Sequence, residues 1–432
     1  MHIPLPRFHW KFFLTVIFWC PTLGLAALAP GALGELQVRV RVIEKSQDIL
    51  ISANDLTVMS RAAGRGQFIP SLPASPRWKV LCRDRQIQLV SAATDTSTQK
   101  AAYIAVASPK SALQFHSSAG QIKVNDRLYH GDLEIVSQGG FCHVINQLSI
   151  ENYLAGVVDA EFSSLWNEES IAAQVVAART YAYFQVKESQ RKKSDFDLDA
   201  TIKDQVYQGV TKDSRRAAAL VGKTRGLVLA PATSAHSGPI KAFYHSTCGG
   251  QTELPERVWG GAYPGFKRQV VCPFCKNSPV YGWTLSLTPS EIALAIQRGI
   301  EQGGAPQDWP KLRRAMFRPE NLLELRVLGG QTEQRVGEVL MTWNDQGSRL
   351  ELSLSGIRFR EWMGVSRFKS TWFQVQPTLS RGAVKAWQFQ GRGNGHGVGM
   401  CQWGVKAMGE KGYRFASILR YYYPDAILKK MW

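Results

Sequence analysis

The chain has 432 residues, and its composition of 44% hydrophobic and 20% charged residues excludes disorder or a coiled coil as a description of the whole chain. The 52 Lys and Arg residues outnumber the 34 Asp and Glu residues, which gives a formal net charge of +18. This excess predicts an anionic partner: nucleic acid, an acidic polymer or a membrane surface. Seven cysteines are too few for a disulfide-stapled scaffold but are enough for one metal site.

The first thirty residues have the layout of an export signal. Arg7 and Lys11 precede an apolar run over residues 12–29, and small residues follow. We expect residues 1–29 to be a signal peptide or, if uncleaved, an anchor that associates the N-terminus with a membrane. A buried N-terminal helix is the alternative. Export argues against nucleic acid as the partner and favours a cell-surface polymer outside the cytoplasm.

The next part, residues 36–149, is predicted to be rich in strands. Between residues 38 and 42 valine alternates with arginine, which predicts a half-buried strand with a basic outer face. Residues 60–77 are rich in Gly, Pro, Ser and Arg, so they predict a loop. Similar alternating runs recur at residues 86–90, 121–124 and 133–136.

Residues 150–428 mix helical and extended patterns. Residues 150–162 and 168–186 predict two helices, the second with Asn167 as its N-cap. Residues 201–275 are expected to be irregular with short strands, and strand-like alternation returns over 322–375. Two further helices are predicted at residues 290–298 and 415–423. The fold class is therefore α+β, with a β-rich N-terminal part and one mixed unit after it.

Glu161 is the first candidate for chemistry. Tyr153, Val157 and Glu161 are four residues apart, so they share one face of the predicted helix. A carboxyl on an apolar face loses hydration, which favours its neutral form and lets it act as a general acid near neutral pH. The alternative is a glutamate at a helix end that points into water.

Arg179 lies in the largely apolar helical stretch AAQVVAARTYA. One interpretation is a buried arginine paired with an acid. The other is an arginine that orients Glu161 or an anionic ligand by a bidentate contact.

Two pairs of metal-ligand residues have the spacing of a zinc site. His245 and Cys248 form one pair and Cys272 and Cys275 the other, each separated by two residues. Four protein ligands leave no open coordination position, so the zinc would be structural. A disulfide between two of the cysteines, or unrelated thiols, are the alternatives.

Residues 391–404 hold six glycines, which permit tight turns and close approach of the backbone to a ligand. Val398 replaces the last glycine of a dinucleotide fingerprint, so we reject that site and expect no organic cofactor. A thiol enzyme built from Cys401 and His396 is disfavoured, because no orienting carboxylate is evident nearby. A structural loop with a satisfied histidine is the simpler interpretation.

The chain resembles the stage II sporulation protein D family, also called the LytB-type amidase-enhancer family. The matching stretches follow the family's order from about residue 36 to residue 428 and include ENYLAGVVDAEF, ESIAAQVVAARTYAYF, DQVYQGV, FYHSTCGGQTE and GRGNGHGVGMCQWG. The resemblance implies one catalytic unit over residues 150–428, with helices that line a glycan-binding cleft. Residues 245–275 and 391–404 would be its zinc-type and glycine-rich loops.

The resemblance implies a peptidoglycan lytic transglycosylase that cuts amidase-stripped glycan strands between N-acetylmuramic acid and N-acetylglucosamine and leaves 1,6-anhydro ends. Glu161 matches the family's catalytic glutamate, and some members carry zinc near the FYHSxxGG stretch. The partners implied are glycan strands and a cell-wall amidase. The residues expected to contact the glycan are Tyr153, Arg179, Gln205, Tyr207, His396 and Gln402. The sequence departs from the family's usual residues at Phe162, Ser163, Asn394 and Cys401.

Three alternatives stay open at this point. A muramidase would use Glu161 as acid and Asp204 or Glu253 as base, and a zinc hydrolase would work at His245. A non-catalytic module would bind glycan and stimulate an amidase. A transglycosylase needs only one carboxyl, because the sugar's own 6-hydroxyl replaces water, and Glu161 has no evident acidic partner on its face of the helix. Whether Cys82 and Cys142 are paired is also open.

Overall fold

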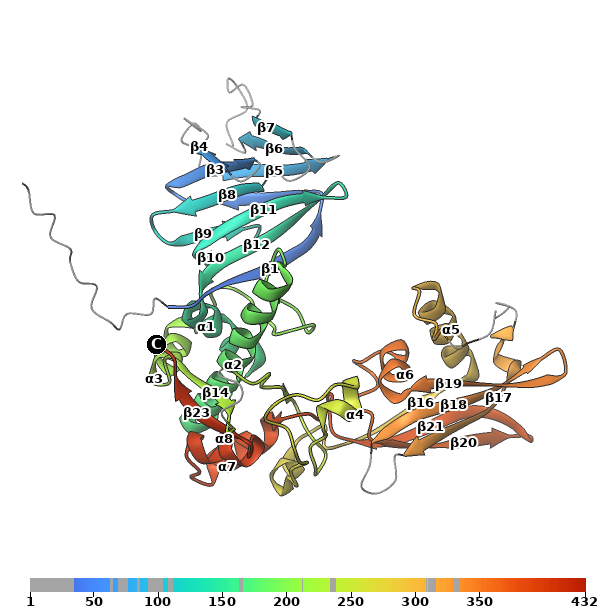
Figure 1. The fold of residues 1–432 in the computed structure, drawn as a ribbon. Coiled ribbons are helices and arrows are strands. Elements are labelled where there is room, and N and C mark those ends of the chain that lie inside the picture. The colour runs from blue at the N-terminus through green and yellow to red at the C-terminus, as the bar shows by residue number, and fades with distance from the viewer. Residues whose placement is uncertain are drawn as a thin grey trace, which may run out of the picture. The chain divides into compact units, whose positions relative to one another are not determined.

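The computed structural model describes residues 35–62, 65–68, 77–83, 86–91, 104–107, 112–162, 166–211, 213–233, 238–307, 309, 316–329 and 335–432. The predicted export segment, residues 1–29, lies outside them. No helix of the described residues is both long and apolar enough to cross a bilayer. Helices and several sheets together confirm the predicted β-rich α+β class (Figure 1).

Two sheets make up most of residues 36–149. The seven-stranded sheet has the order β13-β1-β12-β11-β8-β3-β4 and the six-stranded sheet the order β10-β9-β2-β5-β6-β7. Strands of the first sheet are β1 (Gln37–Ser46), β3 (Leu56–Ala62), β4 (Arg65–Phe68), β8 (Ala112–Ser117), β11 (Asp132–Gln138), β12 (Phe141–Ser149) and β13 (Leu198–Asp199). Strands of the second are β2 (Asp48–Ser52), β5 (Arg77–Arg83), β6 (Gln86–Ser91), β7 (Ile104–Ala107), β9 (Gln121–Val124) and β10 (Arg127–His130). Cys82 on β5 and Cys142 on β12 form a disulfide.

The predicted alternation in β1 is present, but its basic face is not free. Val38 and Val40 are fully buried in the core. Arg39 pairs with Asp197, which precedes β13, and Arg41 pairs with Asp199 in β13, each at 2.7 Å. The arginines of β1 therefore hold a distant segment against the sheet through charge-assisted hydrogen bonds.

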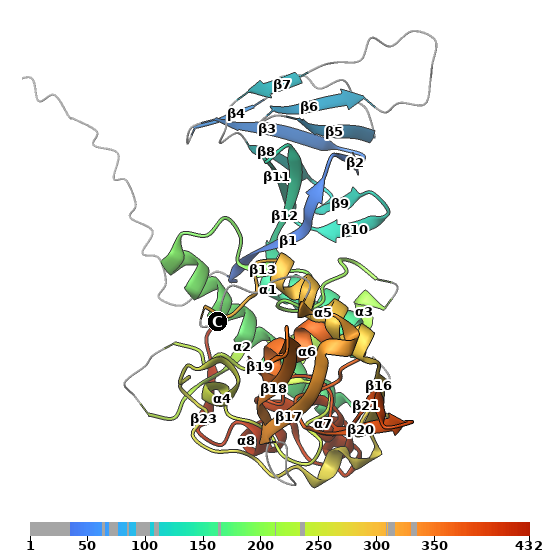
Figure 2. The ribbon, with the colours of Figure 1, turned by 90° about the vertical axis from the view of Figure 1, so that its right-hand side faces the viewer.

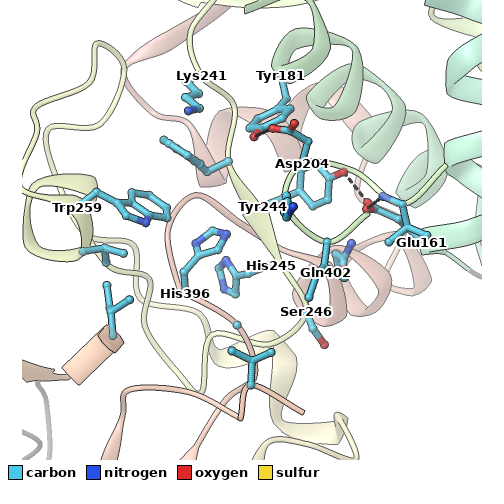
Figure 3. Close-up of a pocket in the computed structure, with 18 of the residues that line it drawn as sticks. Glu161, Tyr181, Asp204, Lys241, Tyr244, His245, Ser246, Trp259, His396 and Gln402 are labelled. Atoms are coloured by element: carbon cyan, nitrogen blue, oxygen red, sulfur yellow. Dashed lines mark hydrogen bonds between the residues drawn. The ribbon is translucent and has the colours of Figure 1, made fainter. Parts of the chain in front are cut away.

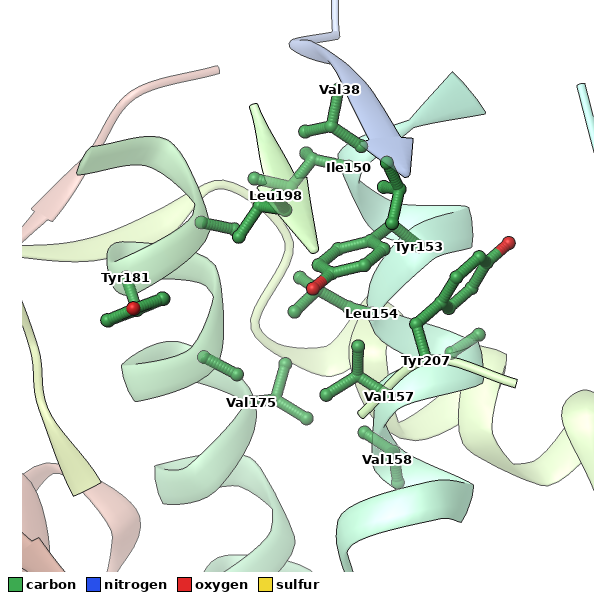
Figure 4. Packing of buried hydrophobic residues seen from close by; sticks show 14 of the residues in the cluster. Val38, Ile150, Tyr153, Leu154, Val157, Val158, Val175, Tyr181, Leu198 and Tyr207 are labelled. Atoms are coloured by element: carbon green, nitrogen blue, oxygen red, sulfur yellow. The ribbon is translucent and has the colours of Figure 1, made fainter. Parts of the chain in front are cut away.

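The helices α1 (Ile150–Glu161) and α2 (Glu168–Lys192) form where the sequence predicts them. Ser149 caps α1 by accepting the Asn152 N–H, and Asn167 caps α2 by accepting the Glu169 N–H, as predicted. Apolar side chains of α1 and α2 pack together with those of β1 and β13 (Figure 4). This packing fixes the C-terminal end of α1, where Glu161 lies.

A second hydrophobic core lies within residues 287–389. In the described residues it is built from two three-stranded antiparallel sheets, two α-helices and one short 3-10 helix; β17, β18 and β19 lie side by side (Figure 2). Its elements are β16 (Gly282–Leu287), α5 (Pro289–Glu301), η3 (Pro319–Asn321), β17 (Leu322–Gly329), β18 (Val336–Asp345), β19 (Ser348–Ser355), α6 (Gly356–Met363), β20 (Phe373–Ser380) and β21 (Ala383–Arg392).

The remaining elements pack with the first hydrophobic core, which is the one that contains Val38 and the apolar side chains of α1 and α2. Its strand pairs are β14 (Leu227–Pro231) with β23 (Ala426–Lys430), and β15 (Tyr244–His245) with β22 (Met400–Cys401). Its helices are α3 (Ser214–Lys223), α4 (Pro255–Trp259), η1 (Pro273–Asn277), α7 (Gln402–Glu410) and α8 (Phe415–Tyr422).

Two local predictions were wrong. Within the stretch predicted as a loop, residues 60–77, the end of β3 and all of β4 pair with each other, because cross-strand pairing overrides a turn-like composition. Residues 63–64 and 69–76 of that stretch lie outside the described residues. The stretch expected to be irregular, residues 201–275, contains α3. Ala217, Leu220 and Val221 of α3 are buried at helical spacing, a signal hidden by the glycine and serine around it.

Candidate active site

A cavity of about 870 Å³ brings together residues from distant parts of the sequence (Figure 3). Glu161, Asp204, Tyr244, His396 and Gln402 line it. Trp259 lies on the side of the cavity away from Glu161 in this view. The part of the chain that forms the second core contributes as well, with Ile357, Arg360, Glu361, Val365 and Thr371.

Two donors hold the Glu161 carboxyl in place. The Val206 N–H donates to Oε1 at 2.8 Å, and the Tyr244 hydroxyl donates to Oε2 at 2.5 Å. The carboxyl is therefore not a solvated helix end, which the sequence left open. Burial raises the pKa of Glu161 to about 7, although the hydrogen bonds from Tyr244 and Val206 oppose the rise. At neutral pH this carboxyl can both give and take a proton.

Tyr153 and Gln205 lie behind the cavity and not in it. Both are fully buried, and the Tyr153 hydroxyl donates to Gln205 Oε1 at 3.0 Å. The Gln205 amide in turn donates to the Tyr244 oxygen at 2.9 Å. We predicted both residues as glycan contacts; the geometry makes them supports of Tyr244, because neither side chain reaches the cavity surface.

Tyr207 is also buried rather than exposed to a ligand. Its hydroxyl donates to Asn146 Oδ1 at 2.9 Å. Its ring packs on Gly156, where an added Cβ would lie 2.6 Å from a ring carbon. Tyr207 therefore packs α1 against the sheet, and this packing requires glycine at position 156. The side chain does not make the predicted glycan contact.

Asp204 lines the cavity, but both of its oxygens are occupied. Oδ1 accepts hydrogen bonds from Tyr181 and Gln185, and Oδ2 accepts the Asp199 N–H. Glu253 is buried and does not line the cavity. Of the two candidate bases of a hydrolase, Asp204 is therefore occupied by hydrogen bonds and Glu253 lies outside the cavity.

The glycine-rich loop supplies His396 and, where the loop runs into α7, Gln402. Both line the cavity, and their contact with glycan stays a prediction. The Val398 N–H donates to His396 Nδ1 at 3.0 Å, and the His396 ring lies 5.1 Å from that of Trp259. Burial, together with nearby His245 and cationic Arg335, lowers the pKa of His396, so the ring is neutral.

Tyr244, Trp259 and Lys241 also line the cavity, and sequence reasoning did not assign them. Tyr244 stands inside the matched stretch FYHSTCGGQTE, so it could have been found there. Trp259 and Lys241 stand in no motif that would have assigned them to the site from the sequence.

Four buried thiols meet near the cavity. The sulfur atoms of Cys248, Cys272, Cys275 and Cys401 all lie within 4.8 Å of one another. The predicted ligand set is therefore corrected at one position: Cys401 takes the place of His245. The reason is the parallel pairing of β15 with β22, which puts His245 opposite Cys401, while the His245 Nδ1–H donates to the Val398 carbonyl.

The surroundings of the thiols fit a metal. Four sulfur ligands at mutual contact match the tetrahedral set that zinc prefers. The buried guanidinium of Arg335 donates to the Cys248 carbonyl at 2.9 Å, while its Nε and Nη1 have no hydrogen-bond partner among the described residues. A buried positive charge beside the cluster compensates the negative charge that four thiolates would bring.

Comparison with known proteins follows the same stretches. The family model "Stage II sporulation protein" matches residues 138–230. An uncharacterized protein of Brachyspira hyodysenteriae is 30% identical over 318 residues, which covers 73% of this chain and 75% of that protein. The chain belongs to the stage II sporulation protein D (SpoIID) family.

Two named relatives of the SpoIID family extend the match. The "Amidase enhancer" of Bacillus subtilis is 26% identical over 303 residues, 64% of this chain and 40% of that protein. "Stage II sporulation protein D" of the same organism is 26% identical over 306 residues, 66% of this chain and 78% of that protein. The SpoIID model covers Glu161 and Val206, whereas Tyr244, the four-thiol cluster and the glycine-rich loop lie beyond it.

Arg179 supports the fold of this SpoIID protein rather than a ligand. It is fully buried and binds Glu151 with Nε and with Nη2, the latter at 2.6 Å. Nη1 and Nη2 also donate to the Leu227 and Val221 carbonyls. The predicted contact with glycan or with Glu161 is therefore wrong, and the paired-arginine interpretation is correct.

We expect Arg179→Met to lower the free energy of unfolding by about 3–5 kcal/mol, because it leaves the Glu151 carboxylate buried without its partner. Denaturant unfolding at pH 7 measures this change. The double variant Arg179→Met/Glu151→Met should recover part of the loss. A single variant as stable as the wild type would contradict the role assigned to this pair.

Proposed function

We propose that this SpoIID-family protein is a peptidoglycan lytic transglycosylase that acts outside the cytoplasm on peptide-free glycan strands. The observation that carries the proposal is Glu161, a poorly hydrated carboxyl with a pKa of about 7 that lines a cavity large enough for sugar rings. The export-type N-terminus and the excess of positive charge fit an anionic cell-wall substrate.

The proposed reaction uses Glu161 twice. First, protonated Glu161 gives its proton to the glycosidic oxygen, and the bond from that oxygen to the anomeric carbon of muramic acid breaks. The 6-hydroxyl oxygen of the same sugar then bonds to the anomeric carbon and releases its proton to the Glu161 carboxylate. The glycosidic bond between two sugars is replaced by a bond between the 6-oxygen and the anomeric carbon of one sugar, and no water is consumed.

The held geometry of Glu161 suits both steps. Tyr244 and Val206 donate to its oxygens, and these hydrogen bonds strengthen when the carboxylate forms after the first step. The engaged oxygens of Asp204 favour this mechanism over a muramidase, which needs a second carboxylate free to activate water.

Analysis of product ends tests the proposal. Purified peptide-free glycan strands would be digested with the wild type and with Asp204→Asn, and the ends identified by mass spectrometry. We expect 1,6-anhydromuramic ends from both proteins. Reducing muramic ends that disappear in Asp204→Asn would establish a muramidase instead.

We expect Tyr244→Phe to shift the pH dependence of cleavage. The Tyr244 hydroxyl stabilises the charged form of Glu161 and so lowers its pKa, although burial keeps that pKa at about 7. Removing the hydroxyl raises the pKa further, and the alkaline limb of kcat/KM, which falls above about pH 7 in the wild type, moves upward by about one pH unit.

The profile of Tyr263→Phe provides the matched control, because that hydroxyl also lies at the cavity but makes no hydrogen bond to Glu161. An alkaline limb that stays in place in Tyr244→Phe would show that Glu161 does not set it.

We propose that the four thiols of Cys248, Cys272, Cys275 and Cys401 hold a structural zinc ion. Four sulfur ligands leave no position for water, so zinc would join η1 to the start of α7 and take no part in the reaction. Cys401 lies in the glycine-rich loop, which also supplies His396 to the cavity, so the ion would stabilise one wall of the cavity.

A cell-wall amidase is the proposed partner, since peptide-free strands must be supplied by an enzyme that removes stem peptides. The name of the Bacillus subtilis relative, "Amidase enhancer", favours a second candidate function, a module that only stimulates an amidase. That candidate predicts that Glu161→Gln still stimulates amidase action fully, whereas the transglycosylase predicts loss of strand cleavage.

A further inference from the structure

The ammonium of Lys241 is held in a box of aromatic rings. Its Nζ lies 5.2–5.8 Å from the ring centroids of Tyr181, Phe184, Phe243 and Tyr263, all within cation–π range. Lys241 is half-buried and lines the same cavity as Glu161. Figure 3 shows it beside Tyr181.

The Lys241 ammonium has no acidic partner in the part of the chain that the structure describes, where Nζ makes no hydrogen bond and no ion pair. Burial lowers the pKa of Lys241, and the charges of Asp204 and Glu188 oppose that shift at longer range. The other two cations of the cavity are engaged: Lys203 pairs with Glu44, and Arg360 donates to the Phe368 carbonyl. Lys241 therefore offers three N–H donors and a full charge to a ligand.

A sugar-binding platform adjoins this cation. Trp259 is 43% exposed, and its ring stacks on Phe243 with the centroids 4.5 Å apart. Phe243 is also the ring nearest to the Lys241 ammonium. Phe243 therefore packs against both the Trp259 ring, on whose exposed surface a sugar can stack, and the Lys241 ammonium. The aromatic rings around the ammonium exclude water and so strengthen its interaction with a carboxylate.

We propose that Lys241 is the specificity residue that binds the free lactyl carboxylate of muramic acid, so that the cavity selects peptide-free strands over strands whose lactyl group is an amide. The inference rests on the proposed function for the identity of the sugar. Its chemistry is general: an ammonium contacts a carboxylate through a charge-assisted hydrogen bond, and a peptide-linked lactyl group has lost that charge.

Binding to two matched ligands tests the proposal. One is a peptide-free glycan strand with free lactyl carboxylates, and the other is the same strand converted to lactyl methylamide. Affinities would be measured by calorimetry in the Glu161→Gln background, so that no strand is cut. We expect the parent to prefer the carboxylate strand by about 10- to 100-fold, which corresponds to one charged hydrogen bond.

The ratio of the two affinities is the readout. Lys241→Met should reduce it to about 1, and Lys241→Arg should keep most of it. Lys123→Met removes an equal charge from an exposed position on β9 and should retain the parent ratio.

A parent ratio near 1, a ratio that survives in Lys241→Met, or an absence of binding to either strand would overturn the assignment to Lys241. Because binding is measured without turnover, this result is separate from the proposed reaction, which fails if the wild type releases no anhydro ends.

Discussion

Glu161→Gln should reduce strand cleavage by about 10²- to 10⁴-fold in kcat while KM changes little, because the amide keeps the shape but cannot transfer a proton. Release of anhydro ends from peptide-free strands measures the loss. Tyr244 and Val206 still have an amide oxygen to contact, so the cavity should keep its form. Glu256→Gln, at an exposed site on α4, is the matched control and should cleave as the wild type does.

A measurement of the stability of Glu161→Gln at two pH values tests whether the variant folds. The pKa of Glu161 is raised in the folded state, so the carboxyl stabilises the fold at low pH and this contribution is lost as pH rises through about 7. Glu161→Gln should therefore be more stable than the wild type at pH 8 by about 1–3 kcal/mol, but not at pH 4. Unimpaired cleavage by a folded Glu161→Gln protein would contradict the mechanism.

Cys275→Ser should lose its bound metal and lower Tm on the order of 10 °C, because metal-binding free energy is folding free energy where a site exists only in the folded state. Elemental analysis should find about one zinc ion per chain in the wild type and much less in the variant. A chelator should lower Tm and cleavage together, whereas a thiol reductant without chelator tests the disulfide of Cys82 and Cys142 separately.

His245→Asn is the control that separates the observed thiol cluster from the ligand set predicted by spacing. His245 is not among the four clustered ligands, so the variant should retain its zinc, whereas Cys401→Ser should lose it. Two results would contradict the proposal. One is untreated wild-type protein that contains no zinc and has the same Tm as protein treated with a chelator. The other is a pair of disulfides among the four cysteines.

The roles of several candidate residues could not be read from sequence, because a matched motif does not state which way a side chain points. Tyr153 and Gln205 are close to Glu161 in space, yet both face the interior and support Tyr244. Arg179 is another example: its partner Glu151 lies on a different helix, and no spacing rule relates the two.

The sequence by itself determined several local elements and singled out Glu161 as the candidate acid. Alternation places Val38 and Val40 in a strand, caps begin α1 and α2, and helical spacing puts Glu161 on the apolar face of α1. These features depend on neighbours within a few residues, which local periodicity records.

Only the tertiary structure decided the metal ligands, the environment of Glu161 and the free cation at Lys241. Cys401 joins Cys248 because two short strands, more than 150 residues apart in sequence, pair in parallel with a particular register. The donors on Glu161 likewise come from Val206 and Tyr244. Contacts of this kind depend on how distant segments pack, and packing of that range leaves no periodic trace in the sequence.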